Sequence, residues 1–184
     1  GAQLGILIRS AEGLELAHRV TAVLLDKTGT ITEGKPTLQC IEVLSSQYAD
    51  NDILRIAYSL EHLSEHPLAH AIIRAAEEKK VAPFKVNGFM AVHGKGIYGT
   101  VAADDINGTS SIGNVRIGAG NTKLCKELGV PVSETIQARL AEAAEKGASP
   151  LLVIIGDECV GLIAVADPVK EGSIRAIHDF HEMN

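Results

Sequence analysis

The sequence has few aromatic residues and no tryptophan; three Phe and three Tyr stand among its 184 residues. Base-stacking platforms for nucleic acids depend on aromatic side chains and are therefore not expected. The formal net charge is -6 and Lys and Arg form no cluster, so the basic face that nucleic acids require is also missing. We expect no nucleic-acid partner, and a core built from Ala, Val, Ile and Leu.

Cysteine is also scarce. Cys40, Cys125 and Cys159 are odd in number and widely spaced, which favours neither a disulfide framework nor a CxxC metal site. This usage fits a reducing compartment.

No apolar run reaches the roughly eighteen residues of a membrane-spanning helix, and the N-terminus lacks the layout of a signal peptide. The apolar and charged fractions, 46% and 22%, are typical of globular proteins with one domain or two small ones. We therefore expect this chain itself to be soluble.

The apolar run Val20–Leu25 is rich in residues that favour strands and ends at Asp26. This pattern predicts a buried parallel strand that carries Asp26 to the carboxyl edge of a sheet. Ligands of open α/β sheets bind at that edge.

The rest of the chain predicts an inserted α+β block followed by a strand, a motif and a final helix. Helix caps are expected at Asp50 or Asn51, at Asn121 and at Ser133, and Pro67 suits the first turn of a helix. Turn signals at Asp104-Asp105 and Asn107-Gly108 divide an antiparallel meander. The predicted strands are 37–44, 151–155 and 160–165, the meander spans 84–118, and the helices are 50–60, 67–80, 122–129 and 134–146.

The loop after the first strand reads Asp-Lys-Thr-Gly-Thr-Ile-Thr from Asp26 to Thr32. A carboxylate at a strand tip can attack the γ-phosphoryl of a nucleotide and form an aspartyl-phosphate, provided that a cation such as Mg²⁺ neutralises the charge. Lys27 adds positive charge, and Gly29 allows the backbone to approach phosphate. A shorter Asp-Lys-Thr alone would be typical of an ordinary polar turn.

All seven residues match the phosphorylation signature of P-type ATPases, whose catalytic domain resembles the haloacid dehalogenase-like phosphotransferases. The resemblance implies that Asp26 is the nucleophile, that Thr28 binds Mg²⁺ through its carbonyl together with Asp26, and that Lys27 and Thr30 lie on the phosphate side. Related phosphatases carry an acid two residues after the nucleophile, where it activates water. Thr28 occupies that position here, which disfavours a phosphatase.

The run Ser64-Glu65-His66-Pro67-Leu68-Ala69 lies at a predicted helix start, where free N–H groups and a histidine can bind a nucleotide. By itself, a histidine such as His66 at a helix start is more often an ordinary surface residue. The run resembles the nucleotide-binding motif of the heavy-metal class of P-type ATPases. That resemblance implies adenine contacts from His66 and from Glu61, five residues earlier, and leaves Glu65 open between ligand contact and helix capping.

The run from His93 to Gly99 contains GxGxxG, but no helix is predicted to follow, which excludes a dinucleotide-binding fold. A glycine-rich hairpin is one interpretation. The heavy-metal class carries a GxG here, which implies that Gly94, Gly96 and Ile97 lie against the nucleotide.

The pair Gly120-Asn121, before Thr-Lys-Leu, resembles the family's Gly-Asn ahead of a short helix. It implies nucleotide contacts from Gly120 and Asn121. The alternatives are plain helix capping by Asn121 and the competing pair Gly113-Asn114.

Asp167-Pro168-Val169-Lys170 resembles the family's DPxK motif near the hinge. Asp167 is expected to hold the magnesium-nucleotide end or to tie the two hinge strands together. Lys170 is expected to place positive charge near phosphate. Capping of the final helix is the alternative for both.

The resemblance covers nearly the whole chain and implies the ATP-binding part of a heavy-metal pump, most often a copper exporter. The expected fold is an α/β phosphorylation domain of haloacid dehalogenase-like type, incomplete here, with an inserted α+β nucleotide-binding domain on an antiparallel sheet flanked by helices. The expected divisions are 1–36 and 161–184 for the connector and phosphorylation domain, and 37–160 for the nucleotide-binding domain.

ATP and Mg²⁺ are the expected cofactors, at the cytoplasmic face of the cell membrane. The expected partners are the transmembrane and actuator domains of a parent pump and a heavy-metal ion bound outside this chain. The Thr-Gly-Asp, lysine and Gly-Asp-Gly segments of the family are expected beyond residue 184, so full turnover by the chain alone is not expected. A nucleotide-binding module without catalysis and a soluble haloacid dehalogenase-like phosphatase remain alternatives; the metal and the direction of transport stay open.

Overall fold

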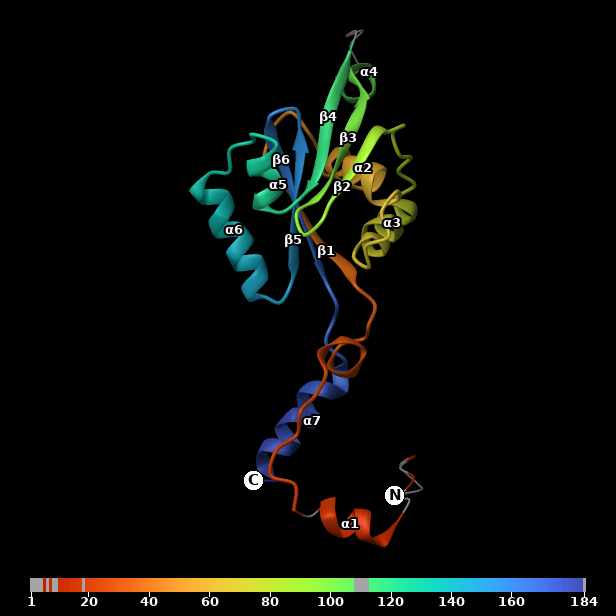
Figure 1. Cartoon of the computed structure of the whole chain (residues 1–184), viewed down its shortest axis with the longest axis vertical. Helices are drawn as coiled ribbons and strands as arrows, with labels where there is room; N and C mark the ends of the chain where they lie inside the picture. Colours follow the sequence, from red (N-terminus) through yellow and green to blue (C-terminus); the bar gives the residue numbers. More distant parts are fainter. Residues whose placement is uncertain (1–4, 6, 8–9, 18, 108–112, 184) are drawn as a thin grey trace. The chain divides into compact units, whose positions relative to one another are not determined.

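The computed structural model in Figure 1 describes residues 5, 7, 10–17, 19–107 and 113–183. The chain divides into two compact units. Unit 1 comprises Gly1–Glu33 and Val169–Asn184, and unit 2 comprises Gly34–Pro168. None of the helices in these described ranges is long and apolar enough to span a membrane.

Unit 2 is built on a six-stranded sheet in the order β1-β6-β5-β4-β3-β2, with every neighbouring pair antiparallel. The predicted meander is confirmed as β2-β3-β4, and the predicted strands 151–155 and 160–165 are confirmed as β5 and β6, which pair antiparallel. The strands are β1 (Thr37–Val43), β2 (Asn87–Val92), β3 (Gly96–Ala102), β4 (Asn114–Gly120), β5 (Ser149–Ile155) and β6 (Glu158–Ala166).

Helices cover both faces of this sheet (Figure 1). One face packs against α2 (Asp50–Glu61) and α3 (Ala69–Glu78), and the other against α5 (Thr122–Glu127) and α6 (Glu134–Glu145). The expected antiparallel sheet flanked by helices is thereby confirmed.

The central strands explain why the sequence reads as continuous apolar runs there. Successive strand residues point to opposite faces. Val153 and Ile163 accordingly join the core under α2 and α3, whereas Leu152 and Leu162 join the core beside α5. Gly161 lets α2 approach β6, because a Cβ there would lie 2.6 Å from Cγ2 of Ile53.

Two of the three predicted helix caps are confirmed. The Oδ1 of Asn121 and the Oγ of Ser133 accept hydrogen bonds from N–H groups in the first turns of α5 and α6, as predicted. The predicted cap at Asp50 or Asn51 is wrong: Ala49 is the N-cap of α2, and the carboxylate of Asp52 accepts the N–H of Ala49 at 2.8 Å. Helix α3 begins two residues after Pro67.

The predicted turn at Asp104-Asp105 is also wrong. These residues lie in α4 (Ala103–Asn107), a short helix between β3 and β4. Gly108 of the second turn signal lies outside the described residues.

Unit 1 contains α1 (Ala11–Ala17), a helical turn at Lys27–Ile31 and α7 (Glu171–Glu182). The predicted strand at 20–25 is not formed; these residues are exposed and have no regular structure. A parallel strand exists only when neighbouring strands pair with it. In the described part of unit 1 the only pairing is an isolated antiparallel bridge between Thr32 and Val169.

The boundary expected at residue 161, where the chain was predicted to re-enter the phosphorylation domain, falls inside β6. That strand is paired along its length with β1 and β5, so it stays with unit 2, and the division comes at Val169. The first division lies at Glu33/Gly34 rather than after Pro36.

Candidate functional site

Unit 2 encloses a cavity of about 410 Å³, formed by the end of α2, the start of α3, the β2–β3 turn and the start of α5. It brings together seven of the eight residues that the sequence assigns to the nucleotide. Glu65 is the exception; it is exposed and does not line the cavity. The seven are Glu61, His66, Gly94, Gly96, Ile97, Gly120 and Asn121.

Glu61 is a buried carboxyl group on the cavity wall, with 6% of its surface exposed. Its Oε2 has no hydrogen-bond partner among the described residues. Burial raises the pKa of Glu61 to about 7, and a hydrogen bond from Ser64 acts in the opposite direction. A buried polar atom without a partner is costly, so this carboxyl group is suited to a polar ligand group in the cavity.

His66 lies in the turn before α3 and is held at two atoms. Its N–H donates to Oγ of Ser64 at 3.2 Å, and its Nδ1 accepts the N–H of Leu68, also at 3.2 Å. Because Nδ1 accepts, the neutral ring carries its proton on Nε2. The ring therefore offers an oriented donor and an aromatic face beside the cavity.

Gly96 and Gly120 are paired across β3 and β4, and the chain is too crowded there for a side chain. A Cβ on Gly96 would lie 2.3 Å from the carbonyl oxygen of Ala119, and one on Gly120 would lie 2.4 Å from that of Lys95. Gly94 adopts φ +68°, which favours glycine in the turn. The glycines thus give this wall a bare backbone surface.

Asn121 caps α5 and lines the cavity at the same time, so the two interpretations from sequence are compatible. Its Oδ1 accepts the N–H of Lys123 at 2.9 Å, and its Nδ2 donates to the carbonyl oxygen of Gly94 at 2.9 Å. Its backbone N–H donates to the carbonyl oxygen of Lys95 at 2.8 Å. Asn121 therefore joins the start of α5 to the β2–β3 turn.

Several lining residues were not predicted from sequence. Lys95 stands between two assigned glycines, and that position was an available signal. Ser149, Pro150 and Leu151 of β5 and Val165 of β6 reach the cavity only through the sheet, and no motif marks them.

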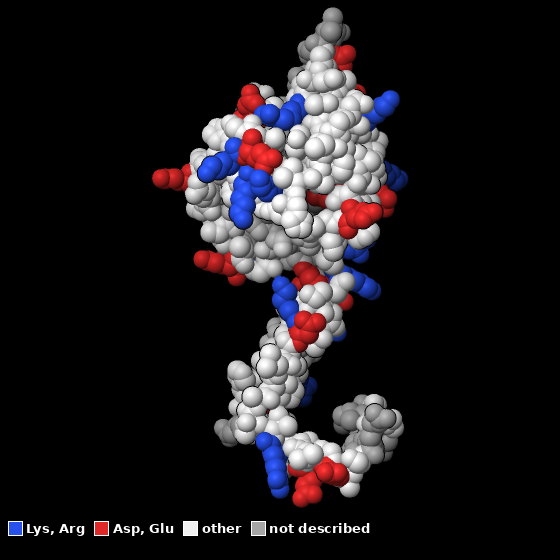
Figure 2. Space-filling view, viewed as in Figure 1, with Lys and Arg blue, Asp and Glu red and all other residues white. Residues whose placement is uncertain are grey.

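Basic side chains gather over α5 on the face shown in Figure 2. Helix α5 carries Lys123 and Lys126, and Lys95 forms an ion pair with Glu127. Positive charge beside the cavity favours an anionic ligand.

In unit 1, Asp26 is exposed immediately before the turn Lys27–Ile31, and its Oδ1 accepts the N–H of Lys27 at 2.8 Å. Gly29 has φ +78°. Thr32, 4% exposed, holds this turn, because its Oγ1 accepts the N–H of Gly29 at 3.2 Å and donates to the carbonyl oxygen of Lys27 at 3.0 Å. Thr32 belongs to the seven-residue motif, but its part in holding the turn was not predicted from sequence.

The start of α7 packs on the same loop within unit 1. The Nζ of Lys170 donates to the carbonyl oxygen of Gly29. The carbonyl oxygen of Ile31 accepts two hydrogen bonds, one from the N–H of Lys170 at 2.9 Å and one from the hydroxyl of Ser173 at 2.8 Å. Lys170 is therefore close to the loop of Asp26, Thr28 and Thr30, and Ser173 is a supporting residue that sequence reasoning missed.

The contacts of Asp167 fit one of its two predicted roles, which is to tie the two hinge strands together. Its Oδ2 and Oδ1 accept the N–H groups of Gly34 at 3.1 Å and Lys35 at 3.0 Å, respectively. These bonds tie the segment that enters unit 2 to the segment that leaves it.

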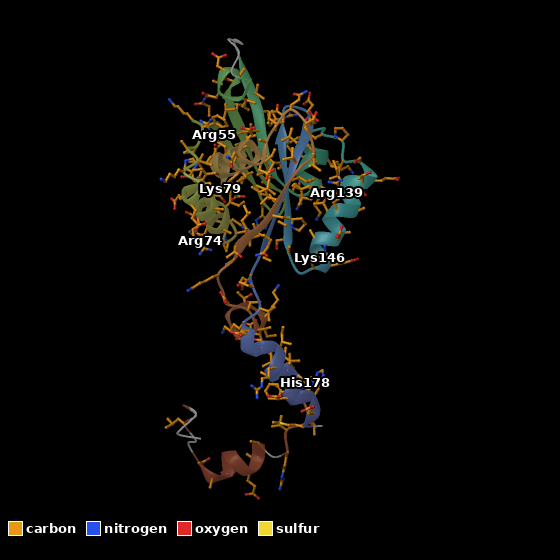
Figure 3. The ribbon with its side chains drawn as sticks, turned by 180° about the vertical axis from the view of Figure 1, so that it is seen from behind. Arg55, Arg74, Lys79, Arg139, Lys146 and His178 are labelled. Carbon is orange, nitrogen blue, oxygen red and sulfur yellow. The ribbon has the colours of Figure 1, made fainter. Side chains whose placement is uncertain are left out.

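The oxygen atoms around Asp26 suit a hard cation. Mg²⁺ prefers oxygen ligands, and the carboxylate of Asp26 and the carbonyl of Thr28 are the groups in this loop that would hold it. A different group of ligand-type side chains, His178, Asp179 and Glu182, lies exposed on α7 (Figure 3). Ion pairs along the helix, His178–Glu182 and Arg175–Asp179, account for that group.

A family model of haloacid dehalogenase-like hydrolases matches residues 20–184. The chain is 35% identical over 182 residues to a copper-exporting P-type ATPase of Legionella pneumophila, covering 99% of this chain and 23% of that protein. It is 39% identical over 183 residues to a copper-transporting ATPase of Rhizobium meliloti, covering 99% and 20%. The chain thus spans about a fifth of the length of these relatives.

Solved structures of P-type ATPases also resemble this chain. A zinc-transporting PIB-type ATPase in its E2.Pi state matches with a TM-score of 0.73 at 27% identity, covering 99% of this chain and 27% of that one. The N-domain of a copper-transporting P-type ATPase matches with a TM-score of 0.52 at 18% identity, covering 70% and 98%; this likeness concerns the fold alone.

Proposed function

The chain belongs to the haloacid dehalogenase-like hydrolase family, and we propose that it is the ATP-binding and phosphoryl-accepting part of a heavy-metal-transporting P-type ATPase. The observation that carries this proposal is the cavity of unit 2, which gathers seven residues from four separate stretches of sequence. The match of the whole chain to P-type ATPases supports it.

On the nucleotide side, the adenine end of ATP lies in the cavity. Glu61 and His66 provide polar contacts, and the bare backbone at Gly94 and Gly96 allows a flat ring to approach closely. Ile97 supplies an apolar surface, and Gly120 and Asn121 close the wall on the side of α5. Lys95 and the lysines of α5 favour the negative charge of the triphosphate.

On the phosphoryl side, the carboxylate of Asp26 attacks the γ-phosphorus in line and displaces ADP, leaving an aspartyl-phosphate. Lys27 and Thr30 stabilise the transferred group. Thr32 and Lys170 fix the backbone of the turn through Lys27 and Gly29. Mg²⁺, held by the carboxylate of Asp26 and the carbonyl of Thr28, supplies charge neutralisation when it is bound.

Thr28 sets the fate of that aspartyl-phosphate. Its side chain cannot activate water as a carboxylate would, so hydrolysis is slow and the intermediate persists while other domains move. A soluble phosphatase is the second candidate function. It predicts turnover of small phosphate esters by the purified chain, whereas we expect none.

The transported ion is a substrate that binds outside this chain, and copper is the proposed cargo because the two relatives described above carry copper in their names. The proposed partners are the transmembrane and actuator domains of the whole pump, and the proposed location is the cytoplasmic face of its membrane. Full turnover belongs to that larger protein. The chain alone is proposed to bind ATP.

Calorimetric titration of the chain with magnesium-ATP tests the proposal. We expect His66→Ala to weaken binding about tenfold, the equivalent of one lost ligand contact of about 1.4 kcal/mol. Glu65→Ala is the matched control, because Glu65 is exposed, adjoins His66 and does not line the cavity. Absence of binding by the folded chain, or equal effects of both variants, would contradict the assignment of this cavity to ATP.

A further inference from the structure

Two buried cysteines meet on the α5 face of the sheet in unit 2, and the proposed function uses neither. Cys125 of α5 is 0% exposed and Cys159 of β6 is 5% exposed. Their Sγ atoms lie 3.7 Å apart, and both residues are reduced. No sequence pattern predicts this pairing, because the two cysteines are 34 positions apart.

A metal ion does not explain the pair. Structural zinc requires four ligands, most often thiolates and imidazoles. Across the described ranges, no further His, Cys, Asp or Glu side chain joins these two thiols in a ligand group.

The chemistry of the pair favours reaction between the two sulfurs. The hydrogen bond from Cys159 lowers the pKa of Cys125, and the same contact, with burial, raises the pKa of Cys159. One thiol is thereby predisposed to ionise while its neighbour stays protonated. The thiolate is the form of cysteine that reacts with oxidants.

We propose that Cys125 and Cys159 form an oxidation site, at which hydrogen peroxide converts the two thiols into a reversible disulfide between α5 and β6. The sulfur of one cysteine attacks the O–O bond, becomes a sulfenic acid and releases one molecule of water. The second sulfur displaces the hydroxyl group, forms the S–S bond and releases another water. The two thiols lose two electrons, and the peroxide gains them.

Limited access of an oxidant to the two sulfurs, and the reducing compartment expected from the cysteine usage, favour a reversible disulfide over a permanent one. Cys125 is carried by α5, so local opening of this helix brings its sulfur into reach of a small oxidant, beside Cys159, which is already slightly exposed. Disulfides in reducing compartments are usually transient and sense redox conditions.

The bond would change the wall of the cavity. A disulfide holds its sulfurs about 2.05 Å apart, which is much closer than the thiols are now. Leu124, next to Cys125, packs against Gly96 and Gly120, and Asn121, one turn earlier, holds the carbonyl of Gly94. Drawing α5 toward β6 therefore displaces residues that line the cavity, and the expected effect on ATP rests on the proposed function.

The first measurement uses a Cys40→Ala chain, because Cys40 is exposed and would react independently. After mild peroxide treatment and unfolding, we expect no thiol that iodoacetamide can alkylate, an intact mass lower by two hydrogens, and a linked Cys125–Cys159 peptide. The melting temperature should rise by about 5 °C or more, because the bond restricts the unfolded chain. The Cys40→Ala, Cys125→Ala chain should show no loss of two hydrogens, no linked peptide and no rise in melting temperature.

Two unmodified thiols, or sulfinic acids without a linked peptide, would overturn the proposal. If the bond forms, magnesium-ATP titration of the oxidised and dithiothreitol-treated chains tests its effect on the cavity. A severalfold weaker and reversible affinity supports the proposal, and an unchanged affinity overturns control of the cavity. If even the reduced chain fails to bind ATP, the proposed function fails, whereas mass and melting still decide whether the bond forms.

Discussion

The two units of this chain differ in how their candidate residues are held. Unit 2 has a continuous core on both faces of its sheet, and its cavity is assembled from distant parts of the sequence. In unit 1, Thr32 is the only described residue that is buried. Yet unit 1 carries the longer and more specific motif. The specificity of a motif and the stability of its surroundings are therefore separate properties.

The reason lies in the range of the interactions. The turn after Asp26 is shaped mainly by Thr32, within five residues of the groups it binds. The cavity requires Glu61, Gly96, Asn121 and Val165 to meet, which only the folded sheet and its helices achieve. Changes in unit 1 should therefore alter chemistry with little effect on stability, and changes in unit 2 should alter both.

Asp26→Asn should have the largest effect. It removes the proposed nucleophile, so the full-length protein should form no phosphoenzyme from γ-labelled ATP in an acid-quench assay. Stability of the chain should hardly change, because Asp26 is exposed. Asp104→Asn, an exposed carboxylate in α4, is the control and should leave labelling intact. Labelling of the Asp26→Asn protein would disprove the assignment of the nucleophile.

A matched pair of isoleucines compares the packing of the two units directly. Ile163 in β6 is 0% exposed, and Ile174 in α7 is 71% exposed. Ile163→Ala should lower the free energy of unfolding by about 2–5 kcal/mol through lost burial and a cavity. Ile174→Ala should change it by less than about 0.5 kcal/mol. Urea unfolding measures both, and similar losses would mean that unit 1 has a core of its own.

Glu61 makes the stability of unit 2 depend on pH. Its pKa is raised from 4.5 to about 7 in the folded state, so between these values the unfolded chain ionises while the folded chain stays protonated. Stability should therefore fall as pH rises through this window and level off above it. The loss amounts to up to about 3 kcal/mol, at 1.36 kcal/mol for each pKa unit.

Glu61→Gln provides the test, because a neutral amide does not titrate. Its free energy of unfolding should exceed that of the parent chain at pH 8 and nearly equal it at pH 5. Glu65→Gln is a suitable exposed control. A parallel pH dependence in the parent chain and in Glu61→Gln would show that this carboxyl group ionises freely when folded.

Asp167→Ala should have the smallest effect, near the division between the units. It removes the acceptor for the N–H groups of Gly34 and Lys35, at about 0.5–1.5 kcal/mol for each hydrogen bond. Hydrogen exchange at these two amides should become faster, while exchange in the core strands β5 and β6 stays slow. Unchanged exchange at Gly34 and Lys35 would show that their hydrogen bonds to Asp167 are not formed in solution.

Sequence patterns predicted most of unit 2 because its signals are local. Alternating strands, turn residues and the side-chain caps at Asn121 and Ser133 act within a few positions, and the structure follows them. The strand predicted at 20–25 failed because an apolar run becomes a strand only with a neighbour to pair with. The prediction of the α2 cap was wrong because the carboxylate of Asp52, at the third position of the helix, accepts the N–H of Ala49, which is the N-cap.

The sequence by itself determined which loop is the proposed site of phosphorylation, since identity and spacing within the seven residues from Asp26 suffice to match the motif. It also named seven of the residues that line the cavity by resemblance, without showing that these residues meet. Only the tertiary structure decided that Glu61 is buried with an unpartnered oxygen, that Gly96 and Gly120 face each other, and that Cys125 lies beside Cys159. The physical reason is that burial and contact between distant positions arise from packing the helices on the sheet, which no local pattern encodes.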